Sequence, residues 1–287
     1  MDRVKVTRCG KTEFQWGKRT YIMGIINVSP DSFSGDGIAT VEGTMAQARR
    51  FIDEGADMLD VGGESTRPNS TPISTDEELK RVIPIIERLA RAVTVPVSID
   101  TMKYEVARQA LAAGASILND QWGLKKEPRL AQLAAEKGVP LILMSNQRDK
   151  GGYDTQAGRD TGFYQDVMAE VIAFLHGSIE AARRAGVPNE NIIIDPGIGF
   201  GKTWQQDIEI MRRLSELKEL GQPILIGTSR KSLIKMVLDL PANQRVEGTA
   251  ATVAIGIANG ADIVRVHDVK QMVRVCKMAD AIVRGVS

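Results

Sequence analysis

The feature that most constrains the fold is a junction that recurs along the chain, in which a helical stretch ends at a glycine and a short β-branched run follows. The junction glycines are Gly55, Gly114, Gly138, Gly186, Gly221 and Gly260. A glycine just past a helix adopts the left-handed conformation that closes the last turn without a steric cost from Cβ. The apolar runs that follow last about four to six residues with little alternation, which is typical of strands covered on both faces.

The stretches before these junctions have helical periodicity. One begins behind Ser74 and the acidic residues that follow it, which favours a capped helix start, and its apolar stripe includes Leu79, Val82 and Ile86. Together with strands at 21–28 and 96–99, the junctions predict eight strand–helix pairs. Eight such units in about 260 residues fit an α/β fold of the TIM (β/α)8 barrel type better than an open doubly wound sheet. We therefore expect a single barrel domain over 21–287, with 1–20 as a short N-terminal extension and a hairpin under the barrel as one option for it.

Composition excludes several classes of protein. The 287 residues carry 37 basic and 36 acidic side chains, so the net charge of +1 gives no long-range attraction to nucleic acid or to an anionic membrane. The longest uncharged stretch, 248–261, is too short and too polar to cross a bilayer, and the N-terminal residues lack the apolar core of a signal peptide. Two cysteines, Cys9 and Cys276, cannot form a disulfide framework. We expect a cytoplasmic protein.

Polar residues stand where each predicted strand ends, and in barrels of this type the chemistry gathers at that rim. In chain order these residues are Asn27, Asp60, Asp100, Asn119 with Asp120, Ser145 to Gln147, Asp195, Ser229 to Lys231, and Arg265 with His267. Polar residues also mark the start of any loop, but a hydrogen-bonding group at all eight ends indicates a binding site.

The distribution of hydrogen-bond acceptors and positive charges among these strand ends predicts the kind of substrate. Acceptors follow strands two, three, four and six of the barrel, whereas fixed cations follow only strands seven and eight, the sector where barrels commonly hold phosphate. On the other side, Asp100, Asn119 and Asp195 suit a flat ligand rich in N–H donors, since a carboxylate accepts two parallel N–H bonds. We expect a substrate with a donor-rich heterocycle at one end and an anion at the other.

Other segments bear on cofactor and metal binding. Residues 197–203 look like the tail of a phosphate-binding loop, but the glycine that a Walker A motif needs is Pro196. A tight turn that lets Phe200 stack on a ring is the better interpretation. The chain has two histidines, which supports a zinc site poorly. A labile Mg²⁺, held mostly by substrate phosphates, stays open. Two long loops, 29–37 and 64–72, bring Phe33 and Arg67 to the same rim.

Taken together, these motifs resemble the dihydropteroate synthase family of pterin-binding barrels. Residues 23–34 and 60–68 look like its two signatures, and 98–101, 118–120, 195–200, 229–232 and 265–268 agree in order and context. The match runs from about residue 20 to the end. One departure is visible after the fifth barrel strand, where Ser145 and Asn146 replace the family's usual His and Met, so that Ser145 receives no role by analogy.

The resemblance implies the condensation of 6-hydroxymethyl-7,8-dihydropterin diphosphate with 4-aminobenzoate, with Mg²⁺ as cofactor, in a homodimer that sulfonamides inhibit. It implies that the pterin contacts are Asp100, Asn119, Asp195, Lys231 and Met144. It implies diphosphate contacts at Asn27, Arg67, Arg265 and His267, with Asn27 as the metal ligand. The aminobenzoate contacts would be Thr66, Arg67, Pro68, Phe200, Ser229 and Lys231. The catalytic residues would be Asp100, Asp195, Lys231, Arg265 and His267.

Three other functions remain open from the sequence. A methyltetrahydrofolate–corrinoid methyltransferase shares the barrel and the pterin pocket but has no use for cations that clamp a diphosphate. A non-catalytic pterin-binding paralogue would retain the pocket alone. A Schiff-base aldolase could use Lys231, whose pKa the neighbouring Arg230 and Arg265 could lower.

Overall fold

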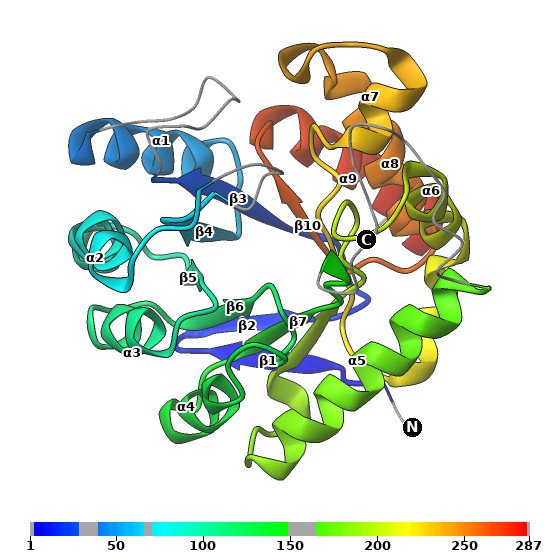
Figure 1. The fold of residues 1–287 in the computed structure, drawn as a ribbon. Helices are drawn as coiled ribbons and strands as arrows, with labels where there is room; N and C mark the ends of the chain where they lie inside the picture. Colours follow the sequence, from blue (N-terminus) through cyan, green and yellow to red (C-terminus); the bar gives the residue numbers. More distant parts are fainter. Residues whose placement is uncertain (1–2, 29–39, 66–70, 149–164, 286–287) are drawn as a thin grey trace.

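The computed structural model describes residues 3–28, 40–65, 71–148 and 165–285, and it is an α/β barrel with its helices outside (Figure 1). The barrel strands are β3 (Tyr21–Asn27), β4 (Met58–Gly62), β5 (Val97–Asp100), β6 (Ile117–Asp120), β7 (Leu141–Met144), β8 (Ile192–Asp195), β9 (Leu225–Ile226) and β10 (Ile263–Val266). The helices are α1 (Val41–Asp53), α2 (Thr75–Ala92), α3 (Tyr104–Ala112), α4 (Arg129–Lys137), α5 (Val167–Arg184), α6 (Trp204–Arg213), α7 (Ser232–Leu238), α8 (Val246–Ala258) and α9 (Val269–Arg284).

The eight strands pair in parallel in the order β9, β10, β3, β4, β5, β6, β7, β8. A parallel bridge between Ile194 and Ile224 connects the two outermost strands and nearly closes the sheet on itself. This arrangement confirms the predicted TIM barrel.

The local signals that the sequence carries are present. All six junction glycines have positive φ, between 65° and 113°. The α2 helix begins after Ser74, whose hydroxyl accepts a hydrogen bond from the backbone N–H of Glu77 at 3.2 Å. These caps fix where each helix gives way to the next strand, and therefore where each strand's carboxyl end lies.

Strand residues alternate between two buried clusters. In β8, Ile192 and Ile194 pack outward against the helices, while Ile193 lies in a second cluster inside the barrel. The inside cluster also takes one residue from most of the other barrel strands: Met23, Met58, Ile117, Ile142, Leu225 and Ile263. Because side chains alternate along a strand, the residues two positions beyond these also point inward.

The N-terminal residues close the opposite end of the barrel. Strands β1 (Val6–Cys9) and β2 (Thr12–Gln15) form an antiparallel hairpin. Its Phe14 and the following Trp16 join Tyr21 in an aromatic group that packs on the inside cluster. The amino end of the barrel is therefore filled mostly with apolar side chains, and the inward-facing carboxylates of the strands lie at the carboxyl end.

Of the helices that the structure describes, none is long and apolar enough to cross a bilayer. Cys9 and Cys276 are both buried and free.

Candidate active site

Period-two alternation places the predicted site residues at one mouth of the barrel. On five of the strands, the residue two positions after the inside-cluster residue is a predicted site residue or its neighbour: Asp60, Asn119, Met144, Asp195 and Arg265. Asp100 ends β5 and lies beside Asn119 in the register of the sheet. Asp60, Asp100, Asn119, Asp195 and Met144 are each less than a tenth exposed. Side chains that are far apart in the sequence therefore meet in one largely buried space.

Arg265 is the centre of this group. Its Nε donates to Asp60 Oδ2 at 2.6 Å and its Nη2 donates to Asp100 Oδ2 at 2.9 Å. Asn119 Nδ2 donates to the same oxygen of Asp60 at 3.0 Å. The sequence suggests that cations and acceptors face each other from opposite sides of the mouth. That interpretation is wrong for Arg265, because its long side chain reaches across to the carboxylates of β4 and β5.

Burial and neighbouring charges set the protonation of this cluster. Burial, reinforced by the Asp60 carboxylate, raises the pKa of Asp100 to about 7, although Arg265 and a hydrogen bond from Gln121 oppose the shift. Burial also disfavours the charge of Arg265, but the two carboxylates outweigh it, so the pKa of Arg265 is raised. The guanidinium thus stays charged, while Asp100 can change protonation near neutral pH.

Gln121 is a site residue that the sequence reasoning missed. Its Nε2 donates to Asp100 Oδ1, so both oxygens of Asp100 have a partner. The signal was present, because Gln121 comes directly after Asn119 and Asp120 at the end of β6. The predicted polar residues of that strand end stop at Asp120, one position too early.

Asp195, which is buried, and Lys231, which is partly buried, are a second set of oppositely charged neighbours. Asp195 Oδ1 accepts from the backbone N–H of Gly197 at 2.7 Å, and Lys231 Nζ donates to the carbonyl of Ile198. Burial raises the pKa of Asp195, and the charge of Lys231 opposes that rise. Burial likewise lowers the pKa of Lys231 to about 8, against the pull of Asp195. Each group therefore helps to keep the other charged.

The glycine-rich segment after β8 is a packed turn. Gly197 has a φ of 70°, and a Cβ placed on it would lie 2.0 Å from the carbonyl oxygen of Ser145. Lys202 is buried within the turn and its Nζ donates to the carbonyls of Ser145, Gly197 and Phe200 at 3.0 to 3.1 Å. All three N–H donors of this lysine are thus used inside the protein, so Lys202 is not available to a phosphate group. The interpretation of a tight turn, rather than a nucleotide loop, agrees with this geometry.

A cation follows β7 that the sequence reasoning did not include. The Arg148 guanidinium lies over the Phe200 ring, with Cζ 4.3 Å from the ring centroid, and Lys231 Nζ lies 4.4 Å from the same centroid. Burial lowers the pKa of Arg148 to about 10. Fixed cations are therefore not confined to the last two barrel strands, which corrects the expectation from the sequence. The predicted polar residues of that strand end stop at Gln147, directly before this arginine.

Ser229 and His267 meet at the ends of β9 and β10. Ser229 Oγ lies 3.0 Å from His267 Nδ1 and accepts from the His267 backbone N–H at 3.2 Å. The neighbouring Arg230 forms an ion pair with Asp268 at 2.6 Å. Of the three polar residues that follow β9, Ser229 and Lys231 thus contact site residues, whereas Arg230 contacts the start of α9.

Asn27 ends β3 and is the predicted metal ligand. Its half-buried carboxamide makes no hydrogen bond within the described part of the chain, which leaves an oxygen available. No group of three or more His, Cys, Asp or Glu side chains in that part could hold a metal ion. One neutral oxygen fits Mg²⁺ that arrives with substrate phosphates and retains waters, but not a cation held by protein alone.

Three predicted residues, Thr66, Arg67 and Pro68, lie outside the described residues, and so does Phe33. The structure therefore does not place the two loops expected at this rim.

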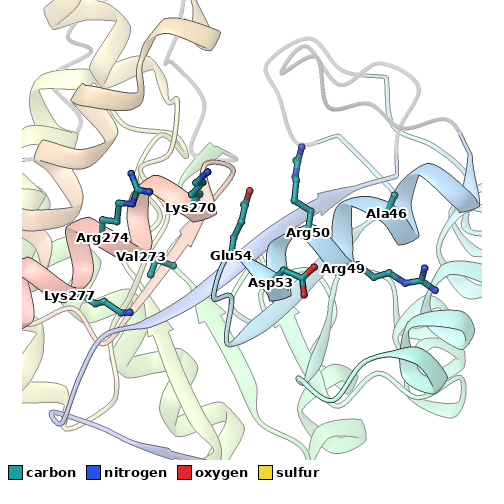
Figure 2. Close-up of a pocket in the computed structure, with 9 residues that line it drawn as sticks. All are labelled: Ala46, Arg49, Arg50, Asp53, Glu54, Lys270, Val273, Arg274 and Lys277. Carbon is teal, nitrogen blue, oxygen red and sulfur yellow. The ribbon is translucent and has the colours of Figure 1, made fainter.

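Two surface hollows differ in their relation to the site. A cavity of about 230 Å³ borders Asp100 and is also lined by Thr101, Gln121, Asn146 and Arg148. A larger, open groove of about 760 Å³ lies between α1 and α9, where Arg50, Lys270 and Arg274 gather around its upper part (Figure 2). Of the predicted site residues that the structure describes, none lines the larger groove. Its charged side chains lie on the outer helices, so we place the chemistry at the barrel mouth.

A barrel with its inward polar groups at the carboxyl ends of the strands defines a TIM-barrel enzyme. The buried carboxylates, carboxamide and cations define a site for a polar, donor-rich substrate with an anionic part.

Comparisons with known proteins narrow this class. The model of the pterin binding enzyme family matches residues 23–267. A dihydropteroate synthase of Clostridium beijerinckii is 49% identical over 96% of this chain and 99% of its own length. The structure of Xanthomonas albilineans dihydropteroate synthase in complex with 7,8-dihydropteroate is 36% identical, with a TM-score of 0.84 over 99% of this chain and all of that one. A Yersinia pestis dihydropteroate synthase in a sulfonamide drug complex is also 36% identical, with a TM-score of 0.90 over 98% of this chain and all of that one.

The chain belongs to the pterin-binding enzyme family and, within it, to the dihydropteroate synthases. The family resemblance inferred from the sequence is confirmed.

Proposed function

We propose that this chain condenses 6-hydroxymethyl-7,8-dihydropterin diphosphate with 4-aminobenzoate, forming 7,8-dihydropteroate and diphosphate in folate biosynthesis. The observation that carries the proposal is the shared barrel mouth of Asp60, Asp100, Asn119, Arg265 and the Asp195–Lys231 pair, in a chain that matches synthases over nearly its whole length. The mouth offers carboxylates for the N–H groups of a pterin ring and cations for a diphosphate.

The pterin ring binds to Asp100, Asn119, Asp195 and Lys231, with Met144 against the ring. The ionised carboxylates accept hydrogen bonds from the pterin N–H groups. Met144 is almost fully buried at the inward end of β7, and its thioether suits a flat aromatic face. The raised pKa of Asp195 and the proximity of Lys231 make the protonation of this edge responsive to a bound ring.

The diphosphate binds toward Arg265 and His267, with Arg67 as a further contact. Arg265 already donates from Nε and Nη2 to Asp60 and Asp100, so it holds the carboxylates and directs its remaining charge toward the anion. Asn27 would contribute an oxygen to Mg²⁺. When bound there, the ion neutralises charge on the diphosphate.

The aminobenzoate binds over Phe200 and beside Ser229 and Lys231, with Thr66, Arg67 and Pro68 as further contacts. The cations already stacked on Phe200 indicate a position where a benzoate ring and its carboxylate find both an aromatic face and positive charge.

The reaction is a substitution with dissociative character. The C–O bond between the pterin methylene carbon and the diphosphate breaks, and its electron pair leaves with the oxygen. The positive charge on the methylene carbon spreads into the pterin ring, where the carboxylates of Asp195 and Asp100 stabilise it. The neutral aromatic amine then forms the C–N bond and loses its proton to solvent. An aniline nitrogen is already unprotonated near pH 7, so no strong general base is required.

The direct test is diphosphate release and dihydropteroate formation with both substrates and Mg²⁺, omitting each component in turn. Turnover must require both organic substrates. Two results would contradict the proposal. One is that the protein transfers a methyl group from a folate, and the other is that borohydride reduction attaches a carbonyl substrate covalently to Lys231.

Asp195→Asn tests the charge-stabilising role, because the amide retains the size of the side chain but not its charge. We expect turnover to fall by at least about a hundredfold, while binding of 7,8-dihydropterin, measured by calorimetry, weakens far less. Unchanged turnover with retained pterin binding would show that the Asp195 charge has no part in the reaction.

We also infer that sulfonamides inhibit this enzyme, because the similar Yersinia pestis synthase forms a complex with a sulfonamide drug.

Two buried, unpaired cysteines support a cytoplasmic location. Exposed apolar side chains on α7, α8 and α9 support assembly as a homodimer.

A further inference from the structure

Gln121 contacts Asp100, the carboxylate proposed to bind the pterin ring. The reaction described above assigns no role to this contact. Its side-chain amide donates to Asp100 Oδ1, while Arg265 donates to Asp100 Oδ2 from the other side. A carboxylate held on both oxygens by donors from two different strand ends cannot turn freely. The lone pairs that remain for a ligand therefore have a fixed direction.

The backbone of Gln121 is itself held in place. Asn146 Nδ2 donates to the Gln121 carbonyl at 3.0 Å, and Asn146 Oδ1 accepts from the Arg148 N–H at 3.1 Å. On the other side, Asp120 Oδ1 accepts from the backbone N–H of Trp122 at 2.9 Å. The turn after β6 is thus tied to the end of β7, and Gln121 is no more than 9% exposed.

The space around Gln121 would allow its side-chain amide to point away from Asp100. A cavity of about 230 Å³ borders Gln121, Asp100 and Thr101, so there is open space beside the carboxylate. The side chain instead lies against Asp100. Asp100 is buried and close to Asp60, so its ionised form is costly. A hydrogen bond from Gln121 therefore stabilises the ionised form of Asp100 more than it would stabilise a carboxylate on the surface.

We propose that Gln121 is a positioning residue that holds Asp100 ionised and correctly turned for the pterin ring, so that it controls affinity at the pterin end of the site. This inference rests on the proposed function, since it assumes that Asp100 receives the pterin N–H groups. Gln121 acts through Asp100 and is not required to touch the reacting atoms.

The charged groups around Asp100 decide how the effect depends on pH. Asp60 on β4 and Glu78 on α2 favour its neutral form, whereas Arg265 on β10 and the Gln121 amide favour its ionised form. Removal of the amide leaves the two carboxylates opposed by Arg265 alone. Asp100 then becomes protonated at a higher pH than in the native protein, and the loss of affinity is greatest at neutral and acid pH.

Gln121→Leu is the main test, with binding of 7,8-dihydropterin measured by calorimetry between pH 6 and pH 9. We expect binding at pH 7 to weaken roughly tenfold or more, and the difference from wild type to shrink toward pH 9. In steady-state assays the KM for the pterin diphosphate rises while the KM for 4-aminobenzoate stays within about twofold. Gln132→Leu makes the same change at an exposed position of α4 and should match wild type throughout.

Gln121→Glu keeps the length of the side chain and places a second carboxyl group against Asp100. Because two carboxylates in contact cannot both ionise easily, this variant should bind the pterin more weakly than Gln121→Leu at pH 7. Thermal unfolding of each variant separates folding damage from a site effect.

Equal affinity of Gln121→Leu and wild type across the pH range would overturn the inference. So would a loss that is the same at every pH, or that raises both KM values together, since a merely structural role predicts that pattern. Failure of the proposed function is distinguishable, because wild-type protein would then fail to bind dihydropterin or to form dihydropteroate at all.

Discussion

At the scale of single residues, the site stabilises charge by placing opposite charges close together within a largely buried mouth. Arg265 between Asp60 and Asp100, and Lys231 facing Asp195, each offset the cost of burying an ionised group. Burial acts against these pairings and moves the pKa values of Asp100 and Lys231 toward neutral pH. The pKa of Asp100 is raised to about 7 by burial and by Asp60, and the pKa of Lys231 is lowered to about 8, chiefly by burial.

These two pKa values predict a bell-shaped profile of kcat/KM for the pterin diphosphate. Activity falls as pH drops below about 7, because Asp100 gains a proton, and it falls above about 8, because Lys231 loses one. In Lys231→Arg the basic limb should disappear up to about pH 10, since a guanidinium remains charged there. The maximum rate falls because the longer side chain fits the site less well.

The measurement is initial rate against pH from 6 to 10 for wild type, Lys231→Arg and the exposed control Lys137→Arg. The control should retain both limbs. A basic limb that persists unchanged in Lys231→Arg would assign it to another group, and the role given to Lys231 would be wrong.

At the scale of elements, the turn after β8 matters most, because it carries Phe200 and contacts both Asp195 and Lys231. Its glycines let the chain lie directly against residues 145–148. A Cβ on Gly197 would be 2.0 Å from the carbonyl oxygen of Ser145, whereas a Cβ on Gly138 would meet no described residue within 4 Å. Both glycines have a similar positive φ, of 70° and 65°. They therefore make a matched pair that separates backbone strain from steric clash.

Gly138→Ala should cost about 1 kcal/mol of unfolding free energy, which is the penalty for a positive φ alone. Gly197→Ala should cost about 2–4 kcal/mol, because the clash with Ser145 adds to that penalty. It should also lower turnover by displacing Phe200. Urea unfolding with activity assays tests both. Equal losses of stability in the two variants would mean that the turn yields easily and that its packing is not tight.

The sequence predicted the elements better than it predicted the contacts between them. The glycine junctions, the capped α2 helix and the inward carboxylates follow from local chemistry and the alternation of strands, and the structure confirms them. The partners of Arg265, and the roles of Gln121 and Arg148, do not follow from local chemistry. Each depends on how far a flexible side chain reaches across a barrel, which neither spacing nor periodicity encodes.

At the scale of the whole molecule, exposed apolar surface is concentrated on one side of the barrel. Among the described residues, the large apolar side chains with more than 40% exposure come from α7, α8 and α9: Met236, Val237, Leu238, Ile255, Met278, Ile282 and Val283. Figure 1 places these three helices next to one another. The family resemblance in the sequence also implies a homodimer. A cluster of this kind is typical of a protein–protein interface.

The small residues of α8 pack against neighbouring elements of the same barrel. A Cβ on Gly248 would lie 2.3 Å from Ile234 of α7, and one on Gly256 would lie 2.3 Å from Ile226 of β9. These glycines therefore let α8 pack closely within its own barrel. The exposed Ile255 between them is free to contact a partner, so the interface we propose uses the outer face of α8 and not its glycines.

We predict that the chain forms a homodimer through this outer surface of α7, α8 and α9. A double variant, Ile255→Glu with Met278→Glu, places two charges in the interface and should shift the protein to monomer in light scattering after gel filtration, because an unpaired charge in an apolar interface is costly. Lys137→Glu on the exposed face of α4 changes charge without touching the surface and should leave the dimer intact. The barrel mouth is built from one chain, so the monomeric variant should retain dihydropterin binding. A wild-type protein that is monomeric at micromolar concentration, or a double variant that remains dimeric, would contradict the prediction and assign these exposed side chains another role.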